Sequence, residues 1–230
     1  MDGVMKVLNV IRAHIMRAFR SRASYMRARS RKPISTRYGF DRGKPVDRLF
    51  IEQFLEKNKQ AIYGKCLEVV DNSYTVRFGG SRVTTSDVID IFPTAKANIC
   101  GDLRNLSGHI ADNEYDCLIV TQTFNVIDDY QSAISECRRI LKPGGTLLVT
   151  MPTVSPAWNL AINLWRFTPR SARYVFEKFF DANRIEVSAL GNKIVTEAFW
   201  MGMAAEDMNS EELALQDETF PLIVGIKAVK

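Results

Sequence analysis

Residues 115–152 contain an apolar strand, a helix and a second apolar strand in immediate succession, and this unit constrains the fold most. The first run, residues 116–120, begins with an aspartate and ends in a polar loop. An amphipathic stretch follows, and the Pro-Gly-Gly turn at residues 143–145 is expected to end its helix just before the second apolar run. Two apolar strands joined by one helix favour parallel pairing. The unit therefore predicts an α/β protein.

The rest of the chain continues this alternation of strands and helices. Further strands are expected at residues 65–70, 82–89, 97–101, 184–190 and 222–229. Helices are expected at residues 46–59, 171–180 and 196–206. The pattern predicts a three-layer sandwich, in which helices cover both faces of a mostly parallel seven-stranded sheet.

The first 32 residues differ from the rest in charge. They hold nine Lys or Arg residues and the single acid Asp2, which gives +8, so a net charge of +5 leaves −3 for residues 33–230. Apolar side chains recur at helical spacing through Val4, Leu8, Ile11, Ile15 and Phe19. We expect a basic amphipathic N-terminal extension, residues 1–36, and one domain, residues 37–230. The extension would bind an anionic membrane surface or a partner protein. Nucleic acid is the least favoured partner, because no aromatic residues interleave the arginines.

Charges interrupt every apolar run before it reaches the roughly 18 residues that span a bilayer, and no secretory signal pattern follows the start. The four cysteines show no CxxC spacing and the chain has two histidines, so a zinc site is not indicated. Buried free thiols in a reducing compartment are the favoured interpretation of the cysteines. These features predict a cytoplasmic protein, peripheral to the membrane if the basic extension binds lipid.

The segment Leu-Lys-Pro-Gly-Gly-Thr-Leu-Leu-Val, residues 141–149, resembles a turn of the class I S-adenosylmethionine-dependent methyltransferases. The regions around Glu68, around Asp102 and at residues 165–169 are similar to other motifs of that family, and the type-11-like members resemble this chain most. The resemblance implies a Rossmann-like domain with S-adenosylmethionine as cofactor.

The same resemblance implies roles for residues after the first strand. Glu68 matches the acid that engages the charged methionine end of the cofactor, directly or through water. Val70 stands in the first position of a turn where the family has glycine, because the backbone passes close to the ligand there. Asp71 and Asn72 follow in that turn and readily adopt turn conformations. The missing glycines are the largest departure from the family.

Acids after the second and third strands match further family positions. The carboxylate that binds the ribose hydroxyls is either Asp87 or Asp90: distance from Glu68 favours Asp90, whereas the apparent end of the strand favours Asp87. Asp102 and the adjacent Leu103 match the exit of the third strand, where an acid commonly binds the adenine amino group.

The loop after the fourth strand should face the methyl donor, with Gln122 and Thr123 on the acceptor side and Phe124 in the core. Trp158 and Trp165 either stack on a planar acceptor or pack a lid against the body. No residue is nominated as the general base, and no metal ligands are expected.

These features predict a methyltransferase, with O-methylation of a sugar, lipid-linked or other small acceptor as the expected reaction. The alternative is a catalytically inactive methyltransferase-like binding or scaffold protein at the membrane surface, which the missing glycines motivate. A nicotinamide-dependent oxidoreductase is a distant third, because the first turn lacks GxGxxG.

Overall fold

The structure of the protein is a computed structural model that describes residues 32–157 and 163–230. The chain divides into two units, Met1–Ile34 and Ser35–Lys230. The expected basic helix falls within residues 1–31, outside the described residues, so it stays a prediction. In the part of the chain that is described, no helix is long and apolar enough to cross a membrane.

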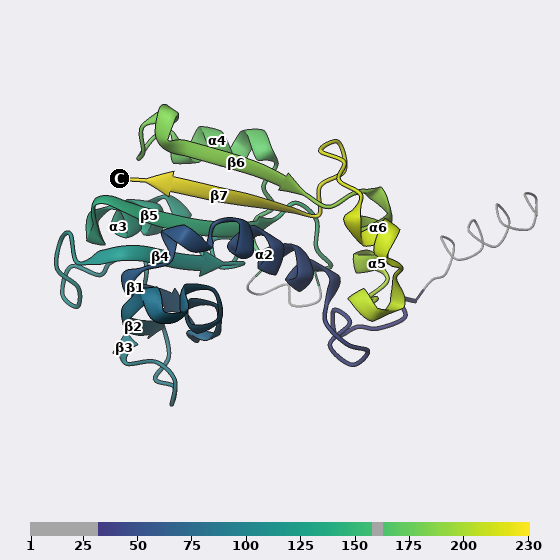
Figure 1. Cartoon of the computed structure of the whole chain (residues 1–230), viewed down its shortest axis with the longest axis horizontal. Coiled ribbons are helices and arrows are strands. Elements are labelled where there is room, and N and C mark those ends of the chain that lie inside the picture. The colour runs from purple at the N-terminus through teal and green to yellow at the C-terminus, as the bar shows by residue number, and fades with distance from the viewer. Residues whose placement is uncertain (1–31, 158–162) are drawn as a thin grey trace, which may run out of the picture. The chain divides into compact units, whose positions relative to one another are not determined.

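Seven strands of the second unit form a single sheet (Figure 1). They are β1 (Gly64–Val69), β2 (Val83–Asp90), β3 (Ile99–Cys100), β4 (Tyr115–Thr121), β5 (Leu141–Pro152), β6 (Ile185–Leu190) and β7 (Ile223–Val229). Their order is β3-β2-β1-β4-β5-β7-β6; β1 to β5 pair in parallel, and β7 is antiparallel to β5 and β6. The expected mostly parallel, seven-stranded sheet is confirmed.

Helices cover both faces of this sheet. They are α2 (Val46–Lys57), α3 (Tyr130–Ile140), α4 (Pro169–Phe176), α5 (Lys193–Trp200) and α6 (Ser210–Ala214), with a π-helix at Thr75–Gly79 and short 3₁₀ turns. Residues of α3 and α4 share one apolar cluster with the sheet, and residues of α2 and α5 share the other. The three layers expected from the sequence are therefore present.

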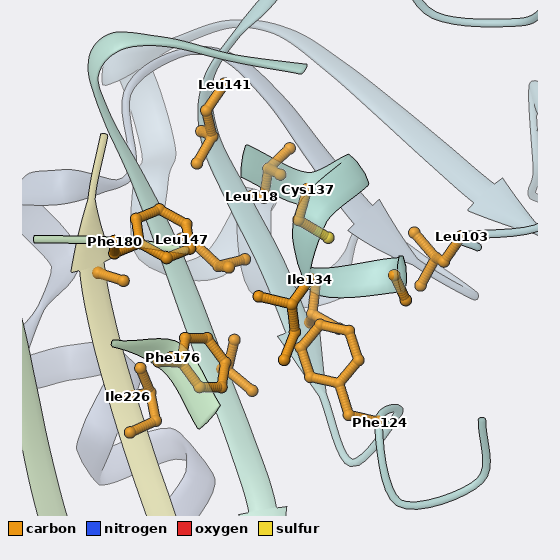
Figure 2. Packing of buried hydrophobic residues seen from close by; sticks show 14 of the residues in the cluster. Leu103, Leu118, Phe124, Ile134, Cys137, Leu141, Leu147, Phe176, Phe180 and Ile226 are labelled. Atoms are coloured by element: carbon orange, nitrogen blue, oxygen red, sulfur yellow. The ribbon is translucent and has the colours of Figure 1, made fainter. Parts of the chain in front are cut away.

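The two clusters divide the side chains of each central strand between the faces. In β5, Leu147 and Val149 belong to the α3/α4 cluster, whereas Leu148 belongs to the α2/α5 cluster. This follows from the two-residue period of a strand. Figure 2 shows the first cluster, in which Phe124 and Phe176 meet edge to face with ring centroids 6.2 Å apart. Both faces of β5 are thus buried, as its uninterrupted apolar sequence requires.

Helix starts follow local capping chemistry. The side chain of Asp129 accepts a hydrogen bond from the backbone N–H of Ser132 and caps α3, as an acid before a helix is expected to do. Thr168 caps α4 in the same way, with Pro169 in the first turn. The sequence interpretation of the Pro-Gly-Gly turn was wrong in one detail. The helix ends at Ile140, and Pro143 to Gly145 lie inside β5, because Leu141 already pairs with Tyr115 of β4.

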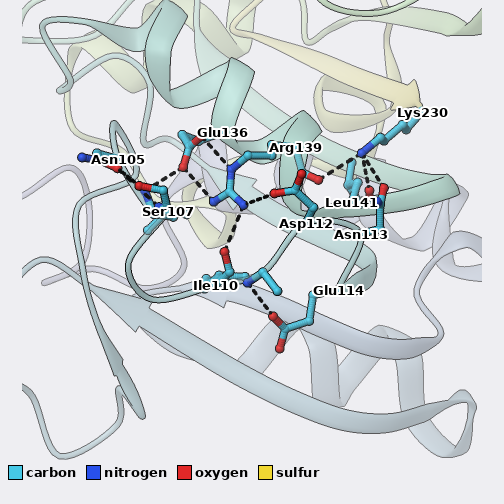
Figure 3. A network of polar contacts seen from close by, with 12 residues as sticks. Asn105, Ser107, Ile110, Asp112, Asn113, Glu114, Glu136, Arg139, Leu141 and Lys230 are labelled. Atoms are coloured by element: carbon cyan, nitrogen blue, oxygen red, sulfur yellow. Dashed lines mark hydrogen bonds and ion pairs between the residues drawn. The ribbon is translucent and has the colours of Figure 1, made fainter.

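A polar network holds the amino-terminal ends of β4 and β5 (Figure 3). Arg139 of α3 forms ion pairs with Glu136 at 2.8 Å and Asp112 at 2.6 Å, and donates to the carbonyl of Ile110. Lys230 Nζ donates to the carbonyl of Leu141 at 2.7 Å. These contacts hold α3 against the loop before β4. They lie at the amino-terminal ends of the strands, whereas the candidate site described below lies at the carboxyl ends.

One prediction about the cysteines was wrong. Cys66, Cys117 and Cys137 are buried free thiols, but Cys100 is exposed. It lies on β3, the edge strand of the sheet, which has a neighbouring strand on one side only.

Candidate functional site

The register of the sheet brings the carboxyl ends of four strands to one level. Val69 pairs with Ile89, and Glu68 pairs with Ile119, so the residues that follow β1, β2 and β4 start at the same edge. Asp90 pairs with Cys100, which adds the exit of β3. In open α/β sheets ligands bind beyond these ends. The candidate residues named from the sequence, except Asp87, therefore lie at the carboxyl ends of these strands, although they are far apart along the chain.

Glu68 is buried at the end of β1, with 3% of its surface exposed. Its carboxylate accepts hydrogen bonds from the backbone N–H and the hydroxyl of Thr75, both at 2.7 Å, and from the N–H of Tyr74 at 3.3 Å. Burial raises the pKa of this carboxyl to about 7, although the hydrogen bonds from Thr75 and Tyr74 act in the opposite direction. Glu68 thus holds the turn after β1 through its hydrogen bonds to Tyr74 and Thr75. Its carboxyl group is protonated below about pH 7 and releases the proton near neutral pH.

Val70 begins that turn with a backbone φ of 75°, in the left-handed region that glycine favours. Its side chain is 56% exposed, so packing does not compensate for the unfavourable backbone. Asp71 accepts hydrogen bonds from the N–H and the hydroxyl of Ser73, and Asn72 donates to Ser86 at 3.2 Å. The turn therefore has the conformation of a glycine-containing turn, built from residues that hydrogen-bond locally.

We expect Val70→Gly to raise the free energy of unfolding by about 1 kcal/mol. A β-branched residue in this region costs about 1–3 kcal/mol, and the greater freedom of glycine in the unfolded chain offsets about 0.5–1 kcal/mol of the gain. Urea denaturation measures the difference. Val76→Gly is the matched control, because Val76 is also exposed but lies in the π-helix with no positive φ, and its replacement should destabilise. If Val70→Gly lowered the free energy of unfolding, the backbone of Val70 would not be strained.

The two candidate ribose ligands lie in different surroundings. Asp87 lies within β2, where its carboxylate accepts from the Tyr115 hydroxyl at 2.8 Å and from the Asn98 amide at 2.7 Å, with Lys65 at 3.4 Å. Asp90 is the last residue of β2, and its carboxylate accepts from the N–H of Phe92 at 3.1 Å. Asp90 therefore lies at the carboxyl end of β2, whereas Asp87 lies within the strand and already contacts Tyr115, Asn98 and Lys65.

Asp102 and Leu103 follow β3. Both carboxylate oxygens of Asp102 are bound by Arg104, the closest contact being 2.5 Å, and the Arg104 hydrogen bonds lower the pKa of Asp102. Arg104 also pairs with Asp128 at 2.7 Å, in the loop after β4. Leu103 is buried. Asp102 is therefore ionised. Arg104 connects it to the loop after β4, because the guanidinium binds both Asp102 and Asp128.

The loop after β4 holds two amide side chains, each with one buried atom that lacks a partner among the described residues. Gln122 has a positive φ of 50°, and its Nε2 makes no hydrogen bond with the described residues. Asn125 is 8% exposed, and its Oδ1 likewise lacks a partner among them. The Thr123 hydroxyl donates to the carbonyl of Thr121, and Phe124 packs in the core as expected. Buried polar groups are rarely left unpaired, so this loop is suited to bind a polar ligand.

A cavity of about 230 Å³ opens beside this loop. Its polar wall consists of Asp47, Arg48, Gln122, Asn125, Ser155 and Asn163. Tyr38, Phe40 and Phe199 supply aromatic surface to it, and the rings of Tyr38 and Phe199 stack with centroids 6.0 Å apart.

Residues 35–45, which we call the strap, close one side of this cavity. The strap is tied to the segment after α5 by the Arg42–Asp207 ion pair at 2.6 Å and by the N–H of Lys44, which donates to Glu206 at 2.9 Å. The wall of the cavity is thus assembled from segments at both ends of the second unit.

Sequence reasoning missed Asp47 and Arg48. Both lie in the first turn of α2 and line the cavity. Desolvation raises the pKa of Asp47, even though Arg48 lowers it. A signal was present, since a basic residue in the first turn of a helix opposes the helix dipole and needs another reason to be there.

The tryptophan prediction is resolved for one residue. The Nε1 of Trp165 donates to the carbonyl of Ile127 at 2.9 Å, and its ring packs against Tyr130 with centroids 5.3 Å apart. Trp165 therefore packs the segment after β5 against the body. Trp158 lies outside the described residues.

Comparison of the sequence with known proteins gives one match. Residues 71–149 match the family model of a methyltransferase domain. No curated protein matches the sequence.

Solved structures show the fold over most of the chain. An S-adenosylmethionine-dependent methyltransferase from Mesorhizobium loti is similar with a TM-score of 0.57 and 11% identity, covering 80% of this chain and 100% of the other. A SAM-dependent methyltransferase from Archaeoglobus fulgidus gives a TM-score of 0.54 and 12% identity, covering 80% and 94%. A putative sarcosine dimethylglycine methyltransferase from Galdieria sulphuraria gives 0.52 and 15%, covering 81% and 90%.

A methyltransferase domain implies S-adenosylmethionine as cofactor, and the residues at the sheet edge are compatible with it. Carboxylates lie at or just after the carboxyl ends of β1, β2 and β3, and the β4 loop supplies an amide donor that lacks a protein partner among the described residues. Val70, with its positive φ, stands where the family has glycine. Residues 71–149 thus match a methyltransferase domain, and the fold is that of S-adenosylmethionine-dependent methyltransferases, which is consistent with the family that the motifs predicted.

Proposed function

We propose that this protein transfers a methyl group from S-adenosylmethionine to a hydroxyl of a small acceptor, such as a sugar or a lipid-linked group. The observation that supports this most is the cavity beside the β4 loop, which adjoins the carboxyl ends of the strands and is lined by Gln122 and Asn125, each with one buried unpaired atom. At about 230 Å³ the cavity is smaller than the roughly 300–1,000 Å³ of typical drug-sized sites, so it suits small parts of the bound ligands rather than a large acceptor.

Each edge residue has a role in this proposal. Glu68 holds the methionine end of the cofactor, Asp90 the ribose and Asp102 the adenine, with Leu103 beside it. Gln122 and Thr123 face the acceptor side. When bound, the cofactor supplies an electrophilic methyl group on sulfur. The protein contributes mainly by holding the acceptor oxygen in line with that methyl group, since positioning alone can supply a large part of a rate enhancement.

Asp47 is the carboxyl group that we assign to the acceptor proton. It lies on the wall of the cavity, and desolvation raises its pKa, which makes its carboxylate a stronger base. One of its oxygens accepts from the backbone N–H of Arg48 at 2.9 Å, which orients the group. A general base must lie within hydrogen-bond reach of the hydroxyl, and the cavity wall meets that requirement for an acceptor bound inside it.

The test of this function is calorimetric titration with S-adenosylmethionine and S-adenosylhomocysteine. We expect micromolar binding that weakens at least tenfold in Asp90→Ala and Asp102→Ala and tightens in Val70→Gly, because these changes remove ligands or open the turn. Asp112→Ala is the control, since Asp112 lies at the opposite edge of the sheet and pairs with Arg139. Absence of binding at millimolar ligand, in a folded protein, would favour the inactive binding or scaffold protein instead.

Attachment of residues 1–32 to an anionic membrane surface stays a proposal from charge alone. Their excess of Lys and Arg is the observation that supports it.

A further inference from the structure

Arg48 occupies a position that an isolated helix does not favour. It lies in the first turn of α2, which begins at Val46. The positive end of the helix dipole is there, so a guanidinium is destabilising unless an anion lies nearby. The side chain is half-buried and lines the cavity beside the β4 loop. Its placement therefore calls for a negatively charged partner.

The protein supplies part of such a partner: burial acts to lower the pKa of Arg48, but attraction to Asp47, Tyr74 and Asp71 raises it overall. Arg48 Nη1 donates to the hydroxyl of Tyr74 at 3.3 Å. Asp47 binds the backbone N–H of Arg48 rather than its guanidinium. Among the ion pairs of residues 32–157 and 163–230, none involves Arg48. Since a guanidinium has five N–H donors in a planar fork, it retains donors for a carboxylate at the cavity.

Tyr74 connects Arg48 to the turn after β1. The backbone N–H of Tyr74 donates to the carboxylate of Glu68, while its hydroxyl accepts from Arg48. One residue of the turn thus contacts an acidic group at one end and a basic group at the other. An α-amino acid carries an ammonium and a carboxylate on the same carbon, and a carboxyl group and a guanidinium that flank one turn complement it above about pH 7, where Glu68 is ionised.

We propose that Arg48 binds the carboxylate of the methionine end of S-adenosylmethionine, an assignment that rests on the proposed function. The first turn of α2 then forms one wall of the cofactor site. Arg48 acts with Glu68, which is on the other side of Tyr74, to recognise the amino-acid end of the cofactor. An anionic group on the acceptor is the competing partner for the guanidinium, and the experiment separates the two.

The experiment compares two ligands that differ at that end. S-adenosylhomocysteine has the amino-acid end, whereas 5′-methylthioadenosine has the same nucleoside and lacks it. We expect Arg48→Ala to weaken S-adenosylhomocysteine about 10- to 100-fold in calorimetric titration, as loss of charge-assisted hydrogen bonds implies. Binding of 5′-methylthioadenosine should change less than about twofold. Arg48→Lys should fall between, because an ammonium keeps the charge but not the planar fork.

Arg77→Ala is the matched control, because Arg77 pairs with Glu52 of α2 at 2.9 Å outside the cavity. It should leave both affinities unchanged. If Arg48→Ala weakened the binding of both ligands equally, Arg48 would have a structural role. If it weakened neither, the guanidinium would bind the acceptor instead. Either result overturns the proposal. Failure of the proposed function has a different signature, since neither ligand would then bind the folded wild-type protein.

Discussion

Replacing Phe124 with alanine is expected to lower the free energy of unfolding by about 3–5 kcal/mol, the usual range for a fully buried phenylalanine. The side chain of Phe124 has no exposed surface and packs in the cluster formed by α3, α4 and the sheet (Figure 2). Its ring also meets Phe176 edge to face, so truncation removes that contact as well. Urea or guanidinium denaturation measures the change.

The consequence extends to the site, because Phe124 lies between Gln122 and Asn125 in the loop after β4. Phe124→Leu is the matched variant and should cost less than about half as much, since it keeps most of the apolar volume. Phe92→Ala, at a side chain that is 70% exposed, should change stability by no more than about 0.5 kcal/mol. A loss below about 1 kcal/mol in Phe124→Ala would show that the loop is not anchored by its phenylalanine.

Glu68 is expected to make the protein less stable as the pH rises from about 4.5 to about 7. Burial raises the pKa of its carboxyl from 4.5 to about 7, so in this interval the folded state holds a proton that the unfolded state has released. Stability therefore falls as pH increases, and the full difference is up to about 3 kcal/mol. Glu68→Gln should remove this component, which denaturation curves at pH 5, 6, 7 and 8 would reveal as a flatter profile.

Thr75→Val is the control for the hydrogen bonds of Glu68, because it should strengthen the pH dependence that Glu68→Gln removes. It removes the hydroxyl that donates to Glu68 at 2.7 Å and keeps the size of a residue with no exposed surface. Without that donor the pKa of Glu68 should rise further, and the loss of stability should extend to higher pH. A Glu68→Gln profile parallel to that of the wild-type protein would mean that Glu68 is ionised throughout the interval.

Local patterns predicted most of the elements. The five parallel strands were located to within two or three residues at most ends, because runs such as residues 116–120 are apolar and bounded by polar turns. The helix starts after Thr168 and Asp129 also follow local signals, since capping depends on neighbouring residues. Helix ends were less accurate: the helix expected to reach residue 180 ends at Phe176, because tertiary contacts rather than local signals decide where the last turn unwinds.

The ligand roles of the named residues stay predictions. Glu68, Asp90 and Asp102 were named because each lies at or just after the carboxyl end of a strand, and parallel strands bring such residues to one side of the sheet. The choice between Asp87 and Asp90 needed the register, which places Tyr115 and Asn98 against Asp87. Asp47 and Arg48 were not named, since nothing in residues 46–59 indicates that the helix starts beside the β4 loop.

The sequence by itself determined the α/β class and the order of the strands along the chain, because periodicity and turn chemistry act over a few residues; the resemblance to the methyltransferases implied the glycine position at Val70. Only the tertiary structure decided that the first turn of α2, the strap and the segment after β4 enclose one cavity. The strap is in turn held by a segment far along the chain, since its Arg42 forms an ion pair with Asp207, 165 residues later. The meeting of these segments depends on how the sheet aligns its strand ends and how the helices pack on it, and no local pattern encodes that alignment.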